Sequence, residues 1–210
     1  MTVWDNIYKN YKKTGEEYAT LRKGLIPEFL EFIEANEFPI KKVLDVGFGN
    51  GKYLEFLKNL GFEVEGIDSS PTAVELAKKS LGGDTKLTLA DIYNYDFPTE
   101  KFSLVISIAA IHHGLKGQVI NAINGIHKSL IPGGRFFITL PDNSGSAHWT
   151  SMIEHDEVEP GTRIPLSGPE KGLPHSSFTR EEIENIFSIF SKFETKLLED
   201  RGRWIISGIK

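Results

Sequence analysis

Cysteine is absent from the 210 residues of this chain. Disulfide bridges, thiolate zinc sites, iron–sulfur clusters and a cysteine nucleophile are therefore excluded. The absence also fits a reducing compartment, although a chain of this length can lack cysteine by chance. Any reactive group must be another side chain or a bound molecule.

Long apolar runs and an excess of positive charge are missing as well. The longest apolar runs, such as residues 104–111, are far below the roughly 18 residues of a membrane-spanning helix. The N-terminus has no basic segment followed by an apolar one, so it does not resemble a signal peptide. With 24 basic and 29 acidic residues the formal charge is −5, which disfavours nucleic acid as a partner. We expect a cytoplasmic protein that does not bind membranes.

Short apolar runs alternate with amphipathic segments from residue 41 onward. The apolar and charged fractions, 40% and 25%, are ordinary for a globular protein, and the length fits one domain. The alternation predicts an α/β fold with a parallel sheet and helices on both faces. The predicted strands of this part are residues 43–46, 64–67, 86–90, 102–108 and 135–140.

The end of the chain follows a different pattern. Thr179 and Glu182 form a capping-box pattern that opens a helix. Residues 193–198 and 204–209 are predicted strands with a short link, so they must pair antiparallel. Residues 141–178 show no strong periodicity, and they contain His148, Trp149 and His155. We interpret this segment as a lid or binding segment, with a plain surface excursion as the alternative.

Three glycines, Gly47, Gly49 and Gly51, follow the first predicted strand and precede a helix. Such a turn lets a ligand approach the backbone and directs free N–H groups at it. The spacing differs from the dinucleotide-binding Gly-x-Gly-x-x-Gly pattern, and Tyr53 after Lys52 excludes a Gly-Lys-Ser/Thr phosphate loop. By itself the trio could be only a tight structural turn.

Acidic residues end the next two predicted strands. Asp68 lies roughly 20 residues past the glycines, where a carboxylate can accept hydrogen bonds from ribose hydroxyls. Its alternative role is a helix N-cap, although Ser69 and Ser70 already offer one. Asp91 can accept from an exocyclic amine, and Ile92 can cover an adenine ring. All these positions are carboxyl ends of successive parallel strands, where open α/β sheets bind ligands.

Together these motifs resemble those of class I S-adenosylmethionine-dependent methyltransferases, over about residues 41–141. The resemblance implies a Rossmann-like seven-stranded sheet, mostly parallel with a C-terminal antiparallel hairpin strand, and S-adenosylmethionine as cofactor. It divides the single domain into an N-terminal helical lid (1–40), a cofactor-binding core (41–141), a substrate lid (142–178) and a C-terminal helix and hairpin (179–210). The motifs are Asp45-x-Gly47-x-Gly49-x-Gly51, Asp68, Asp91-Ile92, the strand 102–108 and Leu130-Ile-Pro-Gly-Gly134.

The resemblance also implies roles for particular residues. The glycines would lie beneath the methionine part, Asp68 would bind the ribose, and Asp91 with Ile92 would contact adenine. Ile108 would lie near the methionine or the transferred methyl group. Phe48 departs from the pattern, since many relatives carry a small residue there. The expected cofactor-binding residues of the core are Asp45, Gly47, Gly49, Gly51, Asp68, Ser69, Asp91, Ile92 and Ile108.

Tyr18 and Arg22 lie four residues apart on a predicted N-terminal helix, so they share one face. In the family such a helix often covers the cofactor, and the guanidinium of Arg22 could pair with the methionine carboxylate. A solvated helix face is the alternative. Tyr11 is a weaker candidate of the same kind.

Histidines supply the catalytic candidates. His112 and His113 follow the fourth strand at the mouth of the predicted site, where His113 could act as a general base. His175 precedes the last helix, where relatives often place substrate contacts. A packed or capping histidine is the alternative. We expect no metal site, because side chains of neighbouring residues diverge on a strand and no carboxylate motif accompanies them.

Two segments are similar to the eukaryotic tRNA wobble-uridine carboxymethyl methyltransferases, namely residues 106–113 and 49–53. Residues 141–178 do not resemble their substrate region, and the acidic charge speaks against tRNA. The leading hypothesis is therefore a methyltransferase acting on a small-molecule acceptor. A tRNA methyltransferase and a non-catalytic S-adenosylmethionine-binding module are the alternatives, and the oligomeric state stays open.

Overall fold

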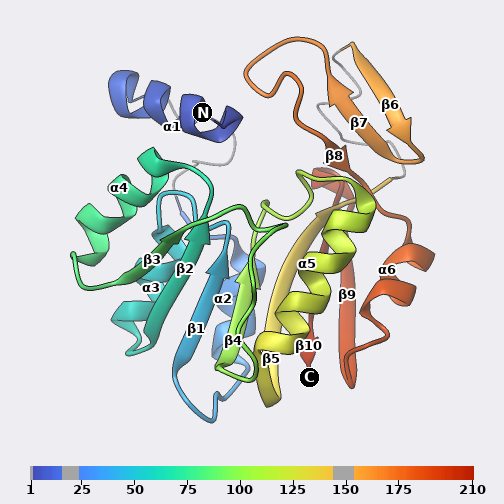
Figure 1. Cartoon of the computed structure of the whole chain (residues 1–210). Coiled ribbons are helices and arrows are strands. Elements are labelled where there is room, and N and C mark those ends of the chain that lie inside the picture. The colour runs from blue at the N-terminus through green and yellow to red at the C-terminus, as the bar shows by residue number, and fades with distance from the viewer. Residues whose placement is uncertain (1, 16–23, 144–153) are drawn as a thin grey trace.

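The computed structural model describes residues 2–15, 24–143 and 154–210. Seven of the described strands form one sheet in the order β3-β2-β1-β4-β5-β10-β9 (Figure 1). Strands β1 to β5 are parallel, whereas β10 is antiparallel to both β5 and β9. The Rossmann-like fold is thereby confirmed. The strands are β1 (Lys42–Val46), β2 (Glu63–Asp68), β3 (Lys86–Leu89), β4 (Phe102–Ser107), β5 (Leu130–Pro141), β9 (Lys192–Leu198) and β10 (Arg203–Ile209).

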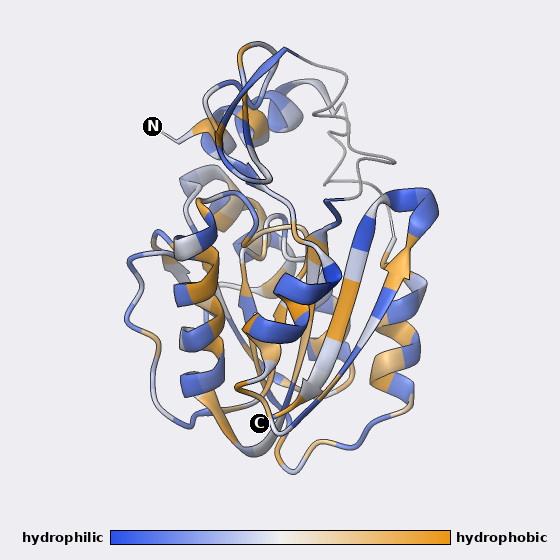
Figure 2. Cartoon of the chain, turned by 90° about the vertical axis from the view of Figure 1, so that its right-hand side faces the viewer, coloured by the Kyte–Doolittle hydropathy of each residue, from blue (hydrophilic) through white to orange (hydrophobic). Residues whose placement is uncertain are grey.

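Helices cover both faces of this sheet. The alternation along a strand explains why, since Leu104 and Ile106 pack in one hydrophobic cluster and Val105 in the other. The helices α2 (Pro27–Glu34), α3 (Lys52–Asn59) and α4 (Pro71–Leu81) share the first cluster, and α5 (Lys116–Ser129) and α6 (Arg180–Phe187) the second. They turn hydrophobic residues toward the sheet and hydrophilic ones outward (Figure 2). No helix among the described residues is long and apolar enough to cross a membrane.

The predicted helix starts are confirmed by side-chain hydrogen bonds. The Ser70 hydroxyl accepts from the Ala73 N–H at 3.1 Å, and Pro71 occupies the first turn of α4. At α6 the N–H of Glu182 donates to the Thr179 hydroxyl, and the Thr179 N–H donates to the Glu182 carboxylate. Each bond satisfies a backbone donor that a helix leaves without an internal partner.

A second, smaller sheet lies above one end of the main sheet, across from helix α1 (Val3–Thr14) (Figure 1). It consists of β6 (His155–Glu159), β7 (Thr162–Pro165) and β8 (His175–Ser176), paired antiparallel. Sequence periodicity missed these strands because they are short and β6 is largely exposed. The N–H of Ser176 donates to the His112 carbonyl at 2.9 Å, which joins the small sheet to the segment after β4.

Strand β5 is longer than the sequence predicted. The expected turn at residues 132–134 lies inside it, and the pairing register with β4 shifts between Phe102 and Leu104. Gly133 has φ +74°, a left-handed conformation that glycine adopts without steric cost. The segment is therefore an irregularity within one strand rather than a turn between elements.

Candidate active site

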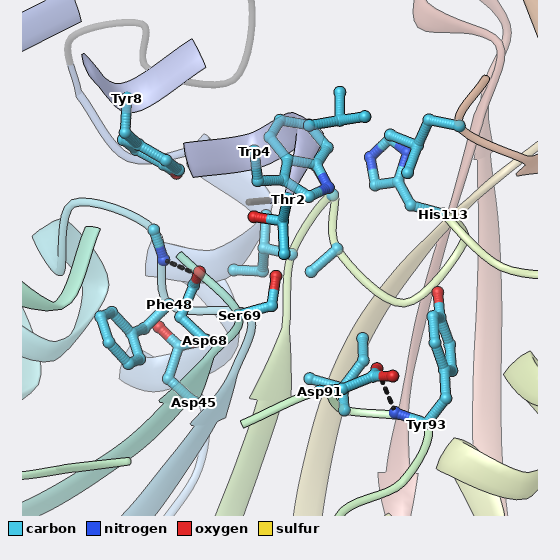
Figure 3. A pocket seen from close by; sticks show the side chains of 18 of the residues that line it. Thr2, Trp4, Tyr8, Asp45, Phe48, Asp68, Ser69, Asp91, Tyr93 and His113 are labelled. Carbon is cyan, nitrogen blue, oxygen red and sulfur yellow. Dashed lines mark hydrogen bonds between the residues drawn. The ribbon is translucent and has the colours of Figure 1, made fainter. Parts of the chain in front are cut away.

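A cavity of about 440 Å³ opens at the carboxyl ends of β1, β2 and β4, beneath α1 (Figure 3). Of the nine core residues that the sequence assigned to the cofactor, all line this cavity except Gly51. Gly51 instead lies where an added Cβ would be 2.9 Å from the Ala77 Cβ, so it permits α3 and α4 to pack. His113 also lines the cavity, as do Leu173 and Pro174 from the segment before β8.

The glycine loop has no room for larger residues. Gly47 and Gly49 have φ values of +82° and +59°. A Cβ atom on Gly47 would lie 2.3 Å from the Ala110 Cβ, and one on Gly49 would lie 2.4 Å from the Tyr8 Oη. Phe48 between them is buried, and Gly66 beneath makes room for its ring, since a Cβ there would be 2.5 Å from Phe48 Cδ1.

Asp68 holds the glycine loop against the start of α4. Its Oδ2 accepts from the Gly49 N–H at 2.9 Å, and its Oδ1 accepts from the Ser70 N–H at 2.9 Å. Burial raises the pKa of Asp68, while backbone hydrogen bonds from Ser70, Gly49 and Ser69 act in the opposite direction. The cap of α4 is Ser70 rather than Asp68, which leaves Asp68 facing the cavity.

Asp45 is the second buried carboxylate of the cavity. Its side chain is 2% exposed, and Oδ2 has no hydrogen-bond partner among the described residues. Burial, and then the negative charge of Asp68, raise its pKa well above the usual range. An acceptor left in this state indicates a ligand that brings a donor, such as an ammonium or a hydroxyl group.

Asp91 lies on the opposite wall, and its carboxylate is already oriented. The N–H of Tyr93 donates to its Oδ1 at 3.0 Å, and Asn94 Nδ2 donates to its Oδ2 at 2.8 Å. Sequence reasoning missed Tyr93, whose hydroxyl donates to the Ile111 carbonyl at 3.1 Å and whose ring lies against Gly114. This contact joins the loop after β3 to the turn that carries the histidines.

Helix α1 covers the cavity with two aromatic side chains that the sequence reasoning missed, Trp4 and Tyr8 (Figure 3). Their spacing of four residues, followed by Tyr11 in the next turn, was the available signal. The sequence pointed instead to Tyr18 and Arg22, which lie outside the described residues.

Asp5 anchors α1 to α4. Its Oδ1 accepts from the Thr72 hydroxyl at 2.7 Å and from the Thr72 N–H at 3.1 Å, and Lys9 Nζ lies 2.8 Å from Oδ2. Burial raises the pKa of Asp5, but the hydrogen bonds from Lys9 and Thr72 outweigh it and lower the value to about 2. The ionised carboxylate therefore favours the docked helix.

The structure brings the two catalytic candidates, His113 and His175, together. Their ring centroids are 4.7 Å apart, and both side chains are buried, as is that of His112. The expectation that His112 and His113 diverge was wrong, because they lie on a turn after β4 rather than on a strand, with rings 3.9 Å apart. The rings of Trp4 and His113 pack in an edge-to-face arrangement, with their centroids 4.6 Å apart.

Comparison with known proteins finds methyltransferases. A family model described as "Methyltransferase domain" matches residues 43–134. "Probable tRNA methyltransferase 9B" of Bos taurus is 28% identical over 81% of this chain, which spans 40% of that protein's length. The "tRNA (carboxymethyluridine(34)-5-O)-methyltransferase" of Saccharomyces cerevisiae is 26% identical over 94% of this chain and 71% of its own length.

Among solved structures, a Burkholderia thailandensis protein superposes with a TM-score of 0.69 at 16% identity. The alignment covers 99% of this chain and 87% of that one. It is described as "1,6-didemethyltoxoflavin-N1-methyltransferase with bound 1,6-didemethyltoxoflavin and S-adenosylhomocysteine". Residues 43–134 are therefore a methyltransferase domain, with the Rossmann-like fold of S-adenosylmethionine-dependent methyltransferases. This domain carries the predicted motifs at the strand ends where the cavity opens.

The cavity of this methyltransferase domain fits S-adenosylmethionine, the cofactor that such domains bind. S-adenosylmethionine carries a positive sulfonium and an ammonium group, and the cavity presents the carboxyl groups of Asp45, Asp68 and Asp91. The unsatisfied Oδ2 of Asp45 offers an acceptor to a ligand donor, and the bare backbone of Gly47 and Gly49 allows close approach. These residues would hold S-adenosylmethionine.

Proposed function

We propose that this methyltransferase transfers the methyl group of S-adenosylmethionine to a small-molecule acceptor. The observation that carries the proposal is the chemistry of the cavity lining. Among the described residues that line it there is one basic side chain other than histidine, Lys52, and there is no arginine. A tRNA acceptor requires contacts to phosphate, which basic side chains supply.

The cofactor and the acceptor divide this cavity between them. Asp45, Gly47 and Gly49 would hold the methionine part, and Asp68 with Ser69 the ribose. Asp91 and Ile92 would contact the adenine ring, and Ile108 would lie near the methyl group. The acceptor then occupies the end formed by His113, Leu173 and Pro174, which also line the cavity.

The chain's own contribution to the reaction is alignment and exclusion of water. S-adenosylmethionine supplies an activated methyl group, and its transfer leaves S-adenosylhomocysteine. Trp4 and Tyr8 cover the cavity, and Tyr8 is only 5% exposed, so α1 limits the access of water. Holding two reactants in line can lower a barrier by about 7–11 kcal/mol at best. His113 and His175 act at the acceptor end, where one of them touches the cavity directly.

Residues 142–178 are the part that selects the acceptor. The small sheet β6–β8 fixes the segment that brings Leu173 and Pro174 to the cavity. Ser176 joins β8 to the turn below through hydrogen bonds to the carbonyls of His112 and Gly114, at 2.9 and 2.6 Å. The Burkholderia protein of the same fold binds 1,6-didemethyltoxoflavin, which is also a small molecule.

The second candidate is a tRNA methyltransferase, as the names of the bovine and yeast relatives suggest. A screen for methylated products separates the two. The protein is incubated with S-adenosylmethionine carrying a labelled methyl group, once with a small-molecule extract and once with total tRNA. We expect label in the small-molecule extract, lost with Asp68→Ala, and label confined to tRNA would overturn the proposal.

A further inference from the structure

We propose that His112, His113 and His175 form a binding site for a divalent transition-metal ion. Each of the three residues offers a ring nitrogen, and these atoms all lie within 4.8 Å of one another. The side chains are 3%, 8% and 3% exposed, so the site is shielded from bulk water. His113 lines the cavity, which places the site at the acceptor end.

The backbone fixes the convergence of these residues. The chain turns after β4, so His112 and His113 lie side by side rather than on opposite faces of a strand. The Ser176 N–H donates to the His112 carbonyl at 2.9 Å, which sets the neighbouring His175 against them. The segments that carry the three imidazoles are thus joined by a tertiary hydrogen bond between backbone groups.

The donor set suits a specific class of ion. Imidazole nitrogen favours Zn²⁺, Cu²⁺, Ni²⁺ and Fe²⁺ over Mg²⁺ and Ca²⁺. Three protein ligands with one open position are typical of catalytic zinc sites, with metal–nitrogen distances of about 2.0–2.1 Å. Tetrahedral geometry then places ligand nitrogens about 3.4 Å apart, so the present cluster must contract by side-chain rotation.

Glu170 supplies the outer contact that such sites require. Its Oε2 lies 3.1 Å from His175 Nε2, and both side chains are almost fully buried. Metal-binding histidines usually hold their other nitrogen against a carboxylate, which fixes the ring and strengthens the ligand. With Nε2 of His175 beside this carboxylate, Nδ1 would be the ligand atom, and the carboxylate would offset part of the ion's charge.

The fourth coordination position of the ion, which no histidine fills, can bind the methyl acceptor. It takes an oxygen donor, such as a hydroxyl or carboxylate group of the acceptor, and lowers the pKa of a bound hydroxyl. A coordinated imidazole has no lone pair left for a proton, so the ion replaces the general-base role predicted for His113. This use of the ion rests on the proposed function, whereas ion binding itself does not.

Metal titration of the tag-free protein, freed of metal by chelation, tests the site. Co²⁺ is followed by its visible absorption, Zn²⁺ is added in competition, and bound metal is counted by mass spectrometry. The absence of cysteine means that thiolate absorption cannot confuse the spectrum. We expect one ion per chain, with affinity reduced at least tenfold by His112→Gln or His175→Gln, and 10–100-fold by Glu170→Gln.

The matched control is His127→Gln, on α5 against Phe190 and outside the cluster. It should bind metal like the parent. S-adenosylhomocysteine binding, measured by calorimetry on every sample, reports folding and the cofactor site. A parent protein that binds S-adenosylhomocysteine but not one equivalent of metal overturns the site alone, as does an equal loss in the His127→Gln variant. A parent protein without S-adenosylhomocysteine binding counts against the proposed function instead.

Discussion

The hydroxyl oxygen of Tyr8 lies 2.4 Å from the position that a Cβ atom on Gly49 would occupy. Helix α1 and the glycine loop are therefore packed against one another with no spare volume. The sequence motif explains glycine at this position only by the close approach of a ligand to the backbone. The structure adds a second reason, which is the covering helix.

Gly49→Ala should weaken S-adenosylhomocysteine binding at least tenfold, as measured by calorimetry. The new methyl group would meet the Tyr8 hydroxyl, and alanine at φ +59° is strained by roughly 1–2 kcal/mol. Adding Tyr8→Phe should restore part of the affinity, because the next atom of the ring, Cζ, is 3.5 Å away. Gly61→Ala is the control, since its φ is +84° but nothing lies within 4 Å. Equal losses in both alanine variants would contradict the steric account.

Asp45→Asn should stabilise the ligand-free protein and weaken the cofactor complex. Burial raises the pKa of Asp45, so the ionised form costs stability, and this cost appears as the pH rises above about 4. Asparagine removes that cost, and the melting temperature should exceed the parent's at pH 7 but not at pH 4. S-adenosylhomocysteine affinity should fall about 10–100-fold, because a hydrogen bond to a charged group contributes about 1.5–3 kcal/mol.

The exposed Asp84 provides the control for this variant. Asp84→Asn should change neither the melting temperature nor the affinity. A melting temperature of Asp45→Asn below the parent's at pH 7 would show that the carboxylate is satisfied in the ligand-free protein.

Asp5→Asn should release α1 from α4. The folded pKa of about 2 lies below the usual value, so the stabilisation is complete above about pH 4 and is lost as the pH falls toward 2. At pH 7 the loss should be about 1.5–3 kcal/mol, seen as faster hydrogen exchange of the α1 amides. The difference from the parent should shrink below pH 4.

Glu75→Gln is the matched control for Asp5→Asn. Glu75 also joins α1 to α4, because its Oε2 lies 2.7 Å from Lys12 Nζ. Both of those side chains are more than 40% exposed, and such surface pairs contribute about 0–1 kcal/mol. The exchange of α1 should therefore hardly change. An effect as large as that of Asp5→Asn would refute the assigned anchor.

Ser176→Ala should loosen the small sheet without affecting the cofactor. The buried Ser176 hydroxyl lies 2.6 Å from the Gly114 carbonyl and 2.7 Å from the Thr162 hydroxyl. Its loss should cost about 1–3 kcal/mol, with faster exchange in β6–β8 and slower methyl transfer. S-adenosylhomocysteine affinity should stay within twofold of the parent's, and the exposed Ser167→Ala should be neutral. A large drop in cofactor affinity would contradict the division of the cavity.

The core of the fold was predictable because each of its strands shows the same pattern in the local sequence. Each buried strand is a short apolar run, and the residue types at its carboxyl end mark the site. Asp68 and Asp91 line the cavity at the edge where this pattern predicts a ligand site, since parallel strands end at the same edge. The antiparallel position of β10 followed from the short link around Gly202.

The rest depends on contacts between distant residues. The helix α5, the strand β5 and two strands of the small sheet separate His113 from His175 in the chain. Their segments are joined by the hydrogen bonds of Ser176 to the carbonyls of His112 and Gly114. The small sheet itself carries no alternation, because residues such as Glu157 and Val158 are both exposed. Trp4 and Tyr8 had a helical spacing, but nothing local indicated that α1 covers the cavity.

The order of the strands constrains how the protein is made. Strand β10 lies between β5 and β9 and pairs with both along residues 203–209. Until these residues leave the ribosome, β5 presents an open hydrogen-bonding edge, and β9 has no partner. Open apolar edges attract other chains. A chain that lacks residues 203–209 therefore leaves the β5 edge open to pairing with other chains.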